Sequence, residues 1–432
     1  MSVPIPESAA AVDVGETFDR LWSQLLPIGL SPGGGYRRFA WNDADLLARS
    51  WFVAAARARG LDVQTDRNGN LWAWWLPTGW SGEPRDAFVS GSHLDSVPDG
   101  GAFDGPLGVV SMLSAIDVLR SRGVQPLRPI AAVVFSDEEG ARFGVACAGS
   151  RLATGALDPS AARGLTDIEG VSLDQAMRRA GFDTTQLGRD EETLRRVGVF
   201  VELHIEQGQA LVDLDGPLGI GTGIWPHGRW RLSFAGQANH AGTTRMTDRC
   251  DPMQPFAAAV FAARILASKH GGVATFGRVH VEPNGTNAIP SKVTAWLDAR
   301  GPDQAVVDAI VNGVSANAHA RATAERVELT VTAESVSAVV EFSADANARL
   351  HRVLDSVAGL GPVPDVGTGA GHDAGVLSSV VPTGMLFVRN PTGVSHSPAE
   401  FAERADCLAG VDALAAVMAD WVSIAPSSRG TS

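Results

Sequence analysis

The stretch Asp86-Ala-Phe-Val-Ser-Gly-Ser-His-Leu-Asp95 holds the pattern that decides the fold. It begins with a short apolar run and then becomes polar, which is typical of a buried β-strand that ends in a polar loop. His93 is therefore expected at the carboxyl end of a strand, the end at which open α/β sheets present side chains to a ligand.

Three further apolar runs lead into polar clusters in the same way. They are Ile130–Phe135 before Ser136-Asp-Glu-Glu-Gly140, Val199–Leu203 before His204-Ile-Glu-Gln-Gly208, and Met385–Val388 before the loop that contains His396. Because the ligand crevice of an open α/β sheet lies outside the carboxyl ends of its strands, we expect the four clusters to meet, although they are far apart in the sequence.

Helical periodicity around these strands indicates an α/β fold. Apolar residues recur at i, i+3, i+4 and i+7 from Gly105 to Arg120, which predicts a helix packed against the sheet. Two helices are expected between Phe18 and Gly60 on either side of the turn-forming Ser31-Pro-Gly-Gly-Gly35, with a first strand at Leu61–Asp66.

The pattern changes between about Arg229 and Val339. It reads strand, helix, strand, strand, helix, strand at Trp230–Phe234, Pro255–Ser268, Ala274–Val281, Lys292–Ala299, Gln304–Ala322 and Val327–Thr332. This β-α-β-β-α-β order is that of a ferredoxin-like unit. Because sheet-forming clusters lie on both sides of it, we interpret residues 227–338 as a domain inserted into a mixed-sheet α/β domain made of residues 1–226 and 339–432.

Length and charge exclude some classes of function. A chain of 432 residues favours two domains. The 35 Lys and Arg residues against 48 Asp and Glu give a net charge of −13, which would repel a phosphate backbone. Nucleic acid is therefore not an expected partner.

The sequence also gives expectations about compartment. No stretch offers the roughly 20 apolar residues of a membrane span, and Met1 to Phe18 lacks the pattern of a secretory signal, so we expect a soluble cytoplasmic protein without a membrane partner. Cys147, Cys250 and Cys407 lack metal or disulfide spacing and are expected to be reduced thiols. The polar tail Ser427–Ser432 is expected to be disordered.

Histidines and carboxylates dominate the four clusters and their neighbourhood: His93, Asp95, Asp104, Glu138, Glu139, His204 and His396. Such ligands suit zinc, manganese or cobalt, and a carboxylate can bridge two ions about 3.5–4 Å apart. A single histidine at a strand end is more often only hydrogen-bonded, but the whole set favours a dinuclear site. Two ions would also offset the repulsion between adjacent glutamates. Asp95 is expected to accept the second N–H of the His93 ring.

These residues lie in longer strings that resemble one family. The strings are Gly91-Ser-His-Leu-Asp-Ser-Val-Pro98, Gly100-Gly-Ala-Phe-Asp-Gly105, Asp137-Glu-Glu-Gly-Ala-Arg-Phe143, His204-Ile-Glu-Gln-Gly208, Ala238-Asn-His-Ala-Gly-Thr-Thr244, Gly369-Ala-Gly-His-Asp-Ala374 and Ser395-His-Ser-Pro398. Over nearly its whole length the chain resembles the M20 metallopeptidase-type amidohydrolases, in the branch of N-carbamoyl-L-amino acid hydrolases and allantoate amidohydrolases.

The resemblance implies two divalent metal ions per subunit and gives each site residue a role. Asp104 would bridge the ions, with His93 and His204 completing one site and Glu139 and His396 the other. Glu138 would be the free carboxylate that acts as the catalytic base. Spacing alone leaves open which of the two glutamates binds metal, and the family pattern assigns them.

The resemblance further implies that the inserted domain is a lid and dimerisation domain of a homodimer. His240, Asn287 and Arg300 match substrate-binding positions, with Arg300 on the substrate carboxylate and His240, from the other subunit, on the oxyanion. Gln207 is expected to contact the ureido group. An Arg at a strand end is often only solvated, and Asn287 could simply shape a turn. His372 and Asp373 could line the pocket or only shape their loop.

The expected activity is hydrolysis of the carbamoyl group of a small carboxylate substrate, allantoate or an N-carbamoyl-L-amino acid, to the amine, carbon dioxide and ammonia. Alternatives within the superfamily are an aminoacylase or dipeptidase, or a β-ureidopropionase; a non-catalytic protein on the same fold is disfavoured because ligands and base are all present. Two departures from the branch pattern, Arg245 and Pro106, remove no ligand.

Overall fold

The computed structural model describes residues 13–80 and 86–423, so the expected disorder of Ser427–Ser432 lies outside the described residues. The chain divides into two compact units. The first unit draws on Met1–Thr222, Glu341–Val366 and Gly371–Ser432, and the second on Gly223–Val340 and Gly367–Ala370. The long segment Gly223–Val340 interrupts the first unit, which is the arrangement of an inserted domain.

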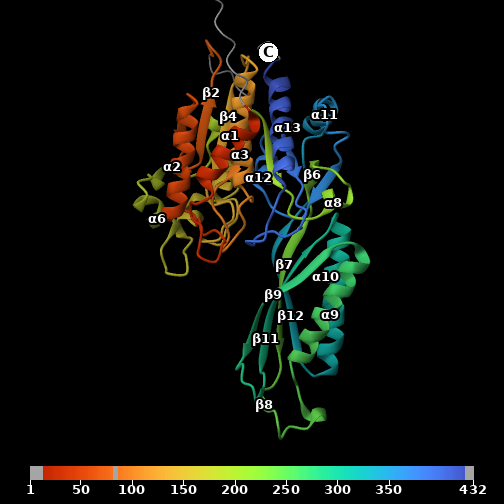
Figure 1. Cartoon of the computed structure of the whole chain (residues 1–432). Coiled ribbons are helices and arrows are strands. Elements are labelled where there is room, and N and C mark those ends of the chain that lie inside the picture. The colour runs from red at the N-terminus through yellow and green to blue at the C-terminus, as the bar shows by residue number, and fades with distance from the viewer. Residues whose placement is uncertain (1–12, 81–85, 424–432) are drawn as a thin grey trace, which may run out of the picture. The chain divides into compact units, whose positions relative to one another are not determined.

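A nine-stranded mixed sheet forms the centre of the first unit (Figure 1). Its order is β1 (Asp62–Thr65), β2 (Leu71–Trp75), β4 (Ile130–Phe135), β3 (Ala87–His93), β5 (Val197–Ile205), β15 (Thr383–Val388), β6 (Leu218–Ile224) and β13 (Val340–Glu341), with β14 (Asp365–Thr368) paired to β6. The pairs β4–β3, β3–β5 and β5–β15 are parallel, whereas β1–β2, β2–β4 and β15–β6 are antiparallel. The four strands expected to carry the polar clusters are therefore the parallel centre of the sheet.

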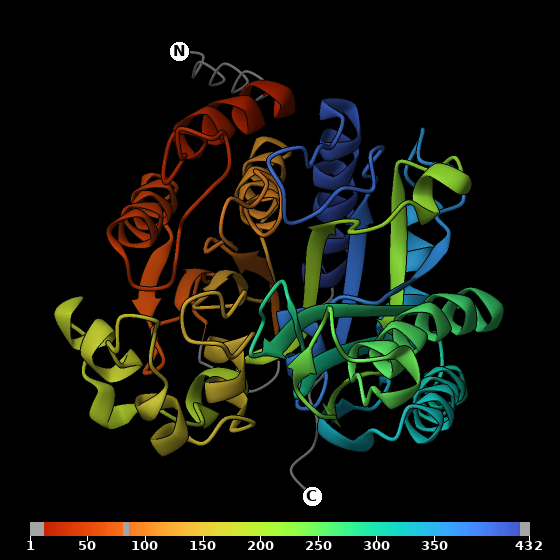
Figure 2. The same ribbon diagram turned by 90° about the horizontal axis from the view of Figure 1, so that it is seen from below.

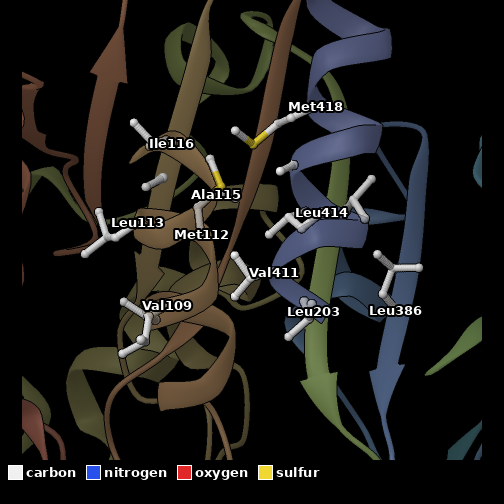
Figure 3. Packing of buried hydrophobic residues seen from close by; sticks show 14 of the residues in the cluster. Val109, Met112, Leu113, Ala115, Ile116, Leu203, Leu386, Val411, Leu414 and Met418 are labelled. Atoms are coloured by element: carbon white, nitrogen blue, oxygen red, sulfur yellow. The ribbon is translucent and has the colours of Figure 1, made fainter. Parts of the chain in front are cut away.

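Helices and side-chain alternation fix the direction of the site residues. On β5, Val201, Leu203 and Ile205 join the core with residues of α1 (Val14–Leu25), α2 (Asp43–Ala58), α3 (Pro106–Ser121), α11 (Ala344–Leu354) and α13 (Arg404–Val422). Figure 3 shows α3 and α13 packing through Met112, Val411 and Leu414 beside Leu203. Because strand side chains alternate, His204 must point to the opposite face.

That opposite face carries shorter helices, which the sequence patterns did not predict. α12 (Asp373–Leu377) contacts β5 and β15, and α4 (Ala148–Thr154) contacts α12. The remaining short helices of this unit are α5 (Pro159–Gly164), α6 (Leu173–Arg179), α7 (Glu191–Leu194) and α8 (Ala210–Asp213), with the 3₁₀ turn Thr184–Gln186. α4 begins directly after the loop that carries Glu138 and Glu139, and so lies close to the expected site.

The second unit confirms the expected β-α-β-β-α-β order. Its elements are β7 (His227–Ala235), α9 (Met253–His270), β9 (Val273–Glu282), β11 (Lys292–Arg300), α10 (Gln304–Ala324) and β12 (Glu328–Ser337). The antiparallel sheet has the order β12-β7-β11-β9. Helices α9 and α10 lie side by side on one of its faces (Figures 1 and 2). Gly271, in the left-handed conformation, ends α9, and the Asp303 side chain caps α10 by accepting from Val306 N at 2.9 Å.

A small ladder extends this unit beyond the sheet. β8 (Asn239–His240) pairs with β10 (Ala288–Ile289), and Ala288 lies opposite His240. The backbone N–H of Ala241 donates to the carbonyl of Asn287 at 3.0 Å. Two of the expected substrate-binding residues, His240 and Asn287, are therefore neighbours.

Candidate metal centre and active site

The four polar clusters meet at the carboxyl ends of the parallel strands, as expected. His93 is the last residue of β3, and Glu138 and Glu139 follow β4. His396 lies in the loop after β15. His204 lies within β5, which continues to Ile205, and not in the loop that was expected to begin there. Asp104 joins them from the loop before α3.

Two histidines face one oxygen of Asp104. Its Oδ1 atom lies 3.4 Å from His93 Nε2 and 3.1 Å from His204 Nε2. The Nδ1–H group of His93 donates to the carbonyl of Asp95 at 3.1 Å, and that of His204 to the carbonyl of Ile205 at 2.8 Å. In these tautomers each Nε2 presents a lone pair to the carboxylate, and both nitrogens are buried without a hydrogen-bond partner. A cation between these two nitrogens and the carboxylate would satisfy the lone pairs.

The second oxygen of Asp104 faces a different pair of side chains. Its Oδ2 atom lies 3.5 Å from His396 Nε2, which lies 3.6 Å from Glu139 Oε2. Asp104 is therefore shared by two triads, one with His93 and His204 and one with Glu139 and His396. The family resemblance implied the same two groups, and their role as metal ligands stays a prediction.

The spacing within both triads fits metal binding. Two ligand atoms about 2.0–2.2 Å from one ion at tetrahedral angles lie about 3.3–3.6 Å apart, close to the 3.1–3.6 Å separations between partners here. Imidazole nitrogens and carboxylate oxygens are the donors that zinc, manganese and cobalt accept. The triads are therefore candidate sites for divalent metal ions.

The carboxylates of the cluster would also be stabilised by added positive charge. Burial, and then repulsion from Asp104, raises the pKa of Glu139 to about 8. Burial raises the pKa of Glu138 well above its usual range, and the carboxylates of Asp373 and Glu139 add to the effect, with His93 opposing it. A divalent ion in either triad would stabilise these carboxylates in their charged forms.

The Asp95 carboxylate was expected to bind the His93 ring. It binds the backbone of Glu138 and Glu139 instead. Its two carboxylate oxygens accept the backbone N–H groups of Glu138, at 3.2 Å, and Glu139, at 3.0 Å. His93 Nδ1 lies 3.7 Å from the Asp95 carboxylate but 3.1 Å from its backbone carbonyl. The prediction of the side chain's role was therefore wrong, because the loop after β4 comes close enough to take both carboxylate oxygens.

Two further acidic residues support the site and were missed in the sequence. Glu400 Oε1 accepts the backbone N–H groups of Phe103 and Asp104, both at 2.9 Å, and so fixes the turn that carries the shared carboxylate. Glu202 accepts from Ser92 Oγ at 2.7 Å. Glu400 lies two residues after the Ser395-His-Ser-Pro398 string. Glu202 precedes His204 on the same face of β5, so period-two alternation was the available signal for Glu202.

Gly105 lets the His93 ring approach the turn after Asp104. Its φ is +83°, and a Cβ atom there would lie 2.5 Å from the Cε1 and Nδ1 atoms of the ring. We predict that Gly105→Ala lowers stability by about 1–3 kcal/mol through backbone strain and weakens metal binding by displacing the ring. Thermal unfolding and metal titration would measure the two effects.

Gly123 supplies the control for this substitution. Its φ is +70°, but a Cβ atom there meets open space. Gly123→Ala should therefore lower stability through backbone strain but leave metal affinity normal. Wild-type metal affinity in Gly105→Ala would contradict the predicted clash.

Gln207 lies against the metal cluster. Its Nε2 atom donates to Asp104 Oδ2 at 2.8 Å and lies 3.3 Å from both Ser395 Oγ and His396 Nε2. Its Oε1 atom is buried without a partner. A free amide oxygen beside the shared carboxylate is suited to accept an N–H group, so contact with a ureido substrate stays a prediction for this residue.

Comparison with known proteins places this arrangement in a family. Residues 89–420 match the model of peptidase family M20/M25/M40. The chain belongs to this family. The M20 chain is 38% identical to the N-carbamoyl-L-amino acid amidohydrolase of Geobacillus stearothermophilus, over 92% of this chain and 96% of the relative. It is 32% identical to the allantoate amidohydrolase of Escherichia coli, over 91% and 95% of the two chains.

A solved structure supports the same placement. The amidase of the hydantoinase/carbamoylase family from Burkholderia multivorans superposes with a TM-score of 0.84 at 30% identity, covering 95% of this chain and 98% of that one. The M20 chain therefore belongs to the hydantoinase/carbamoylase branch and is a hydrolase acting on C–N bonds. Within residues 13–80 and 86–423, no helix has the length and apolar character needed to cross a membrane.

The second unit of the M20 chain holds the other expected substrate residues at opposite ends of one strand. His240 lies in β8, which pairs with β10, and Asn287 directly precedes β10; β10 leads into the start of β11, whereas Arg300 is the last residue of β11. β11 has 9 residues, so at about 3.4 Å per residue its ends lie about 27 Å apart. Within this single chain, His240 and Asn287 therefore lie together, whereas Arg300 lies away from them.

Proposed function

We propose that this chain hydrolyses the carbamoyl group of a small carboxylate, an N-carbamoyl-L-amino acid or allantoate, to the amine, carbon dioxide and ammonia. The observation that carries the proposal is the pair of triads that share Asp104, with the uncoordinated carboxylate of Glu138 beside them. The names of the relatives from Geobacillus stearothermophilus and Escherichia coli support this substrate class.

Each side chain of the cluster has a part in this reaction. His93 and His204 with Asp104, and Glu139 and His396 with Asp104, would hold two divalent ions. When bound, such ions lower the pKa of water and polarise a carbonyl group. Glu138 Oε2 lies 3.7 Å from His93 Nε2, on the side of the cluster. Glu138 takes a proton from the attacking water there and returns it to the leaving nitrogen.

Arg300 is suited to bind the substrate carboxylate. Its Nε and Nη2 atoms donate to Asp298 at 2.8 and 3.2 Å, and its Nη1 atom donates to the carbonyl of Gly369 at 2.6 Å. These bonds use three of the five N–H groups of a guanidinium and hold it in one orientation. The remaining N–H groups can form the charge-assisted bonds that a carboxylate accepts.

The separation along β11 supports a homodimer. A substrate of this class is far shorter than the about 27 Å between the ends of a nine-residue strand. If Arg300 holds its carboxylate and His240 stabilises its oxyanion, the two side chains come from different subunits. We therefore propose that each active site takes His240 and Asn287 from the partner subunit.

Mixing two inactive variants tests this arrangement. His240→Ala and Arg300→Ala should each lose most activity, and a reassembled mixture should regain about a quarter of the wild-type value, since half of the dimers carry one intact site of two. Activity would be measured after joint unfolding and refolding of equal amounts. A mixture as inactive as its components would mean that both side chains act within one subunit.

The substrate is identified by ammonia release from the metal-loaded protein. The panel contains allantoate, N-carbamoyl-L-amino acids and N-carbamoyl-β-alanine, with an N-acyl amino acid and a dipeptide as the competing classes. Ammonia from one carbamoyl compound, lost in Glu138→Ala, supports the proposal and names the substrate. Cleavage of only the N-acyl amino acid or the dipeptide, with metal bound, would replace it with an aminoacylase or a dipeptidase.

A further inference from the structure

We propose that Cys147 is a positioning residue for Glu138: its thiol donates a hydrogen bond to one carboxylate oxygen and thereby turns the other oxygen toward the metal cluster. The proposal rests on the role of Glu138 in the proposed function. Cys147 was not predicted to belong to the site, because its spacing from the other cysteines indicates neither a metal site nor a disulfide.

The loop that carries Glu138 is fixed on the start of α4. The backbone N–H of Cys147 donates to the carbonyl of Glu138 at 2.6 Å, and those of Ala148 and Gly149 donate to Asp137 and Ser136, both at 2.9 Å. Because the first N–H groups of a helix lack partners within the helix, the loop carbonyls satisfy them. The backbone of Glu138 is thereby held, but these bonds leave its side chain free to rotate.

The thiol of Cys147 acts on that side chain. Sγ lies 3.3 Å from Glu138 Oε1, and the cysteine is 3% exposed. Burial, and then the nearby carboxylates of Glu138 and Asp373, raises the pKa of the thiol well above its usual range. The thiol therefore stays protonated and acts as the donor in this contact.

The two oxygens of Glu138 consequently have different surroundings. Oε1 faces Cys147 Sγ, whereas Oε2 lies 3.7 Å from His93 Nε2 in the first triad. The last torsion of a glutamate side chain has broad, shallow minima, so packing alone fixes the plane of its carboxylate poorly. A hydrogen bond to Oε1 selects the orientation in which Oε2 can exchange a proton with water at the cluster.

The backbone of Cys147 allows its structural role to be separated from this contact. Its φ and ψ are 55° and 36°, in the left-handed region that glycine adopts without strain. Cys147→Gly therefore removes the thiol while suiting the backbone. Cys147→Ala removes the thiol and keeps the strain, and Cys147→Ser keeps a hydroxyl donor at the same position.

The test compares these three variants, as metal-loaded full chains, on the substrate that the panel identifies. We expect the Ala and Gly variants to lose about 3- to 30-fold in kcat, since small misplacements of a catalytic group are costly. KM and metal content should be unchanged, and the Ser variant should keep most of the activity. The midpoint of thermal unfolding should be no lower for Cys147→Gly than for Cys147→Ala.

Three results would overturn the proposal: wild-type kcat in both the Ala and the Gly variants, equal losses in Ser and Ala, or metal loss that accounts for the lower activity. Glu138→Gln separates this failure from that of the proposed function. If Glu138→Gln is inactive while Cys147→Ala is fully active, only the role of Cys147 is wrong. If Glu138→Gln itself stays active, the catalytic role of Glu138 is wrong.

Discussion

Glu138→Gln is expected to lower kcat by about 10²- to 10⁴-fold, the usual contribution of a general acid–base group. The amide keeps the shape of the side chain but cannot take a proton from water. Because Glu138 belongs to neither triad, the variant should bind as much metal as the wild type, and KM should change little. Steady-state kinetics and elemental analysis of the purified protein measure both quantities.

The neighbouring residue provides the matched control. Glu139→Gln changes the same chemical group one position further along, but this carboxylate faces His396 in the second triad. It should therefore lose activity together with metal. Normal metal content in Glu139→Gln and metal loss in Glu138→Gln would mean that the two glutamates have the opposite roles.

Asp104→Ala is expected to abolish measurable activity and to remove metal from both sites. Its two oxygens face different triads, at 3.1–3.4 Å on one side and 3.5 Å on the other, so no other residue of the set can replace it. The midpoint of thermal unfolding of this variant should no longer rise when metal is added, because a ligand stabilises only a fold that binds it.

Variants that damage only one triad show whether the metal loss in Asp104→Ala arises because both triads share this carboxylate. His93→Ala and Glu139→Ala each damage one triad and should keep an ion in the other. If Asp104→Ala lost only as much metal as either of them, the two triads would not share this carboxylate as a bridge.

Much of the first unit could be predicted because its signals are local. Each of the four central strands is a short apolar run that ends in polar residues, and parallel strands place such ends together. The strands β2, β6, β13 and β14 were not predicted. β13 and β14 have only 2 and 4 residues, and the strands that pair with β6, such as β15 and β14, are distant from it in sequence.

The supporting contacts of the site could not be predicted for a different reason. Asp95 lies two residues from His93, which favoured a side-chain contact between them, but the fold brings in the backbone of Glu138 and Glu139 as closer partners. Glu400 reaches the turn at Asp104 from nearly 300 positions away in the chain. The metal-binding side chains belong to recognisable residue types, whereas their supports are defined by contacts that only folding creates.

The sequence positions of the triad residues decide when each triad is complete during synthesis. During synthesis the side chains of the first triad are complete at His204, but the second triad lacks His396, which follows 192 positions later (396 − 204). The core has the same dependence, because Val411 and Leu414 of α13 pack on α3 near Met112 (Figure 3). A chain that stops before residue 396 would therefore hold neither the complete pair of triads nor the packing of α13 on α3.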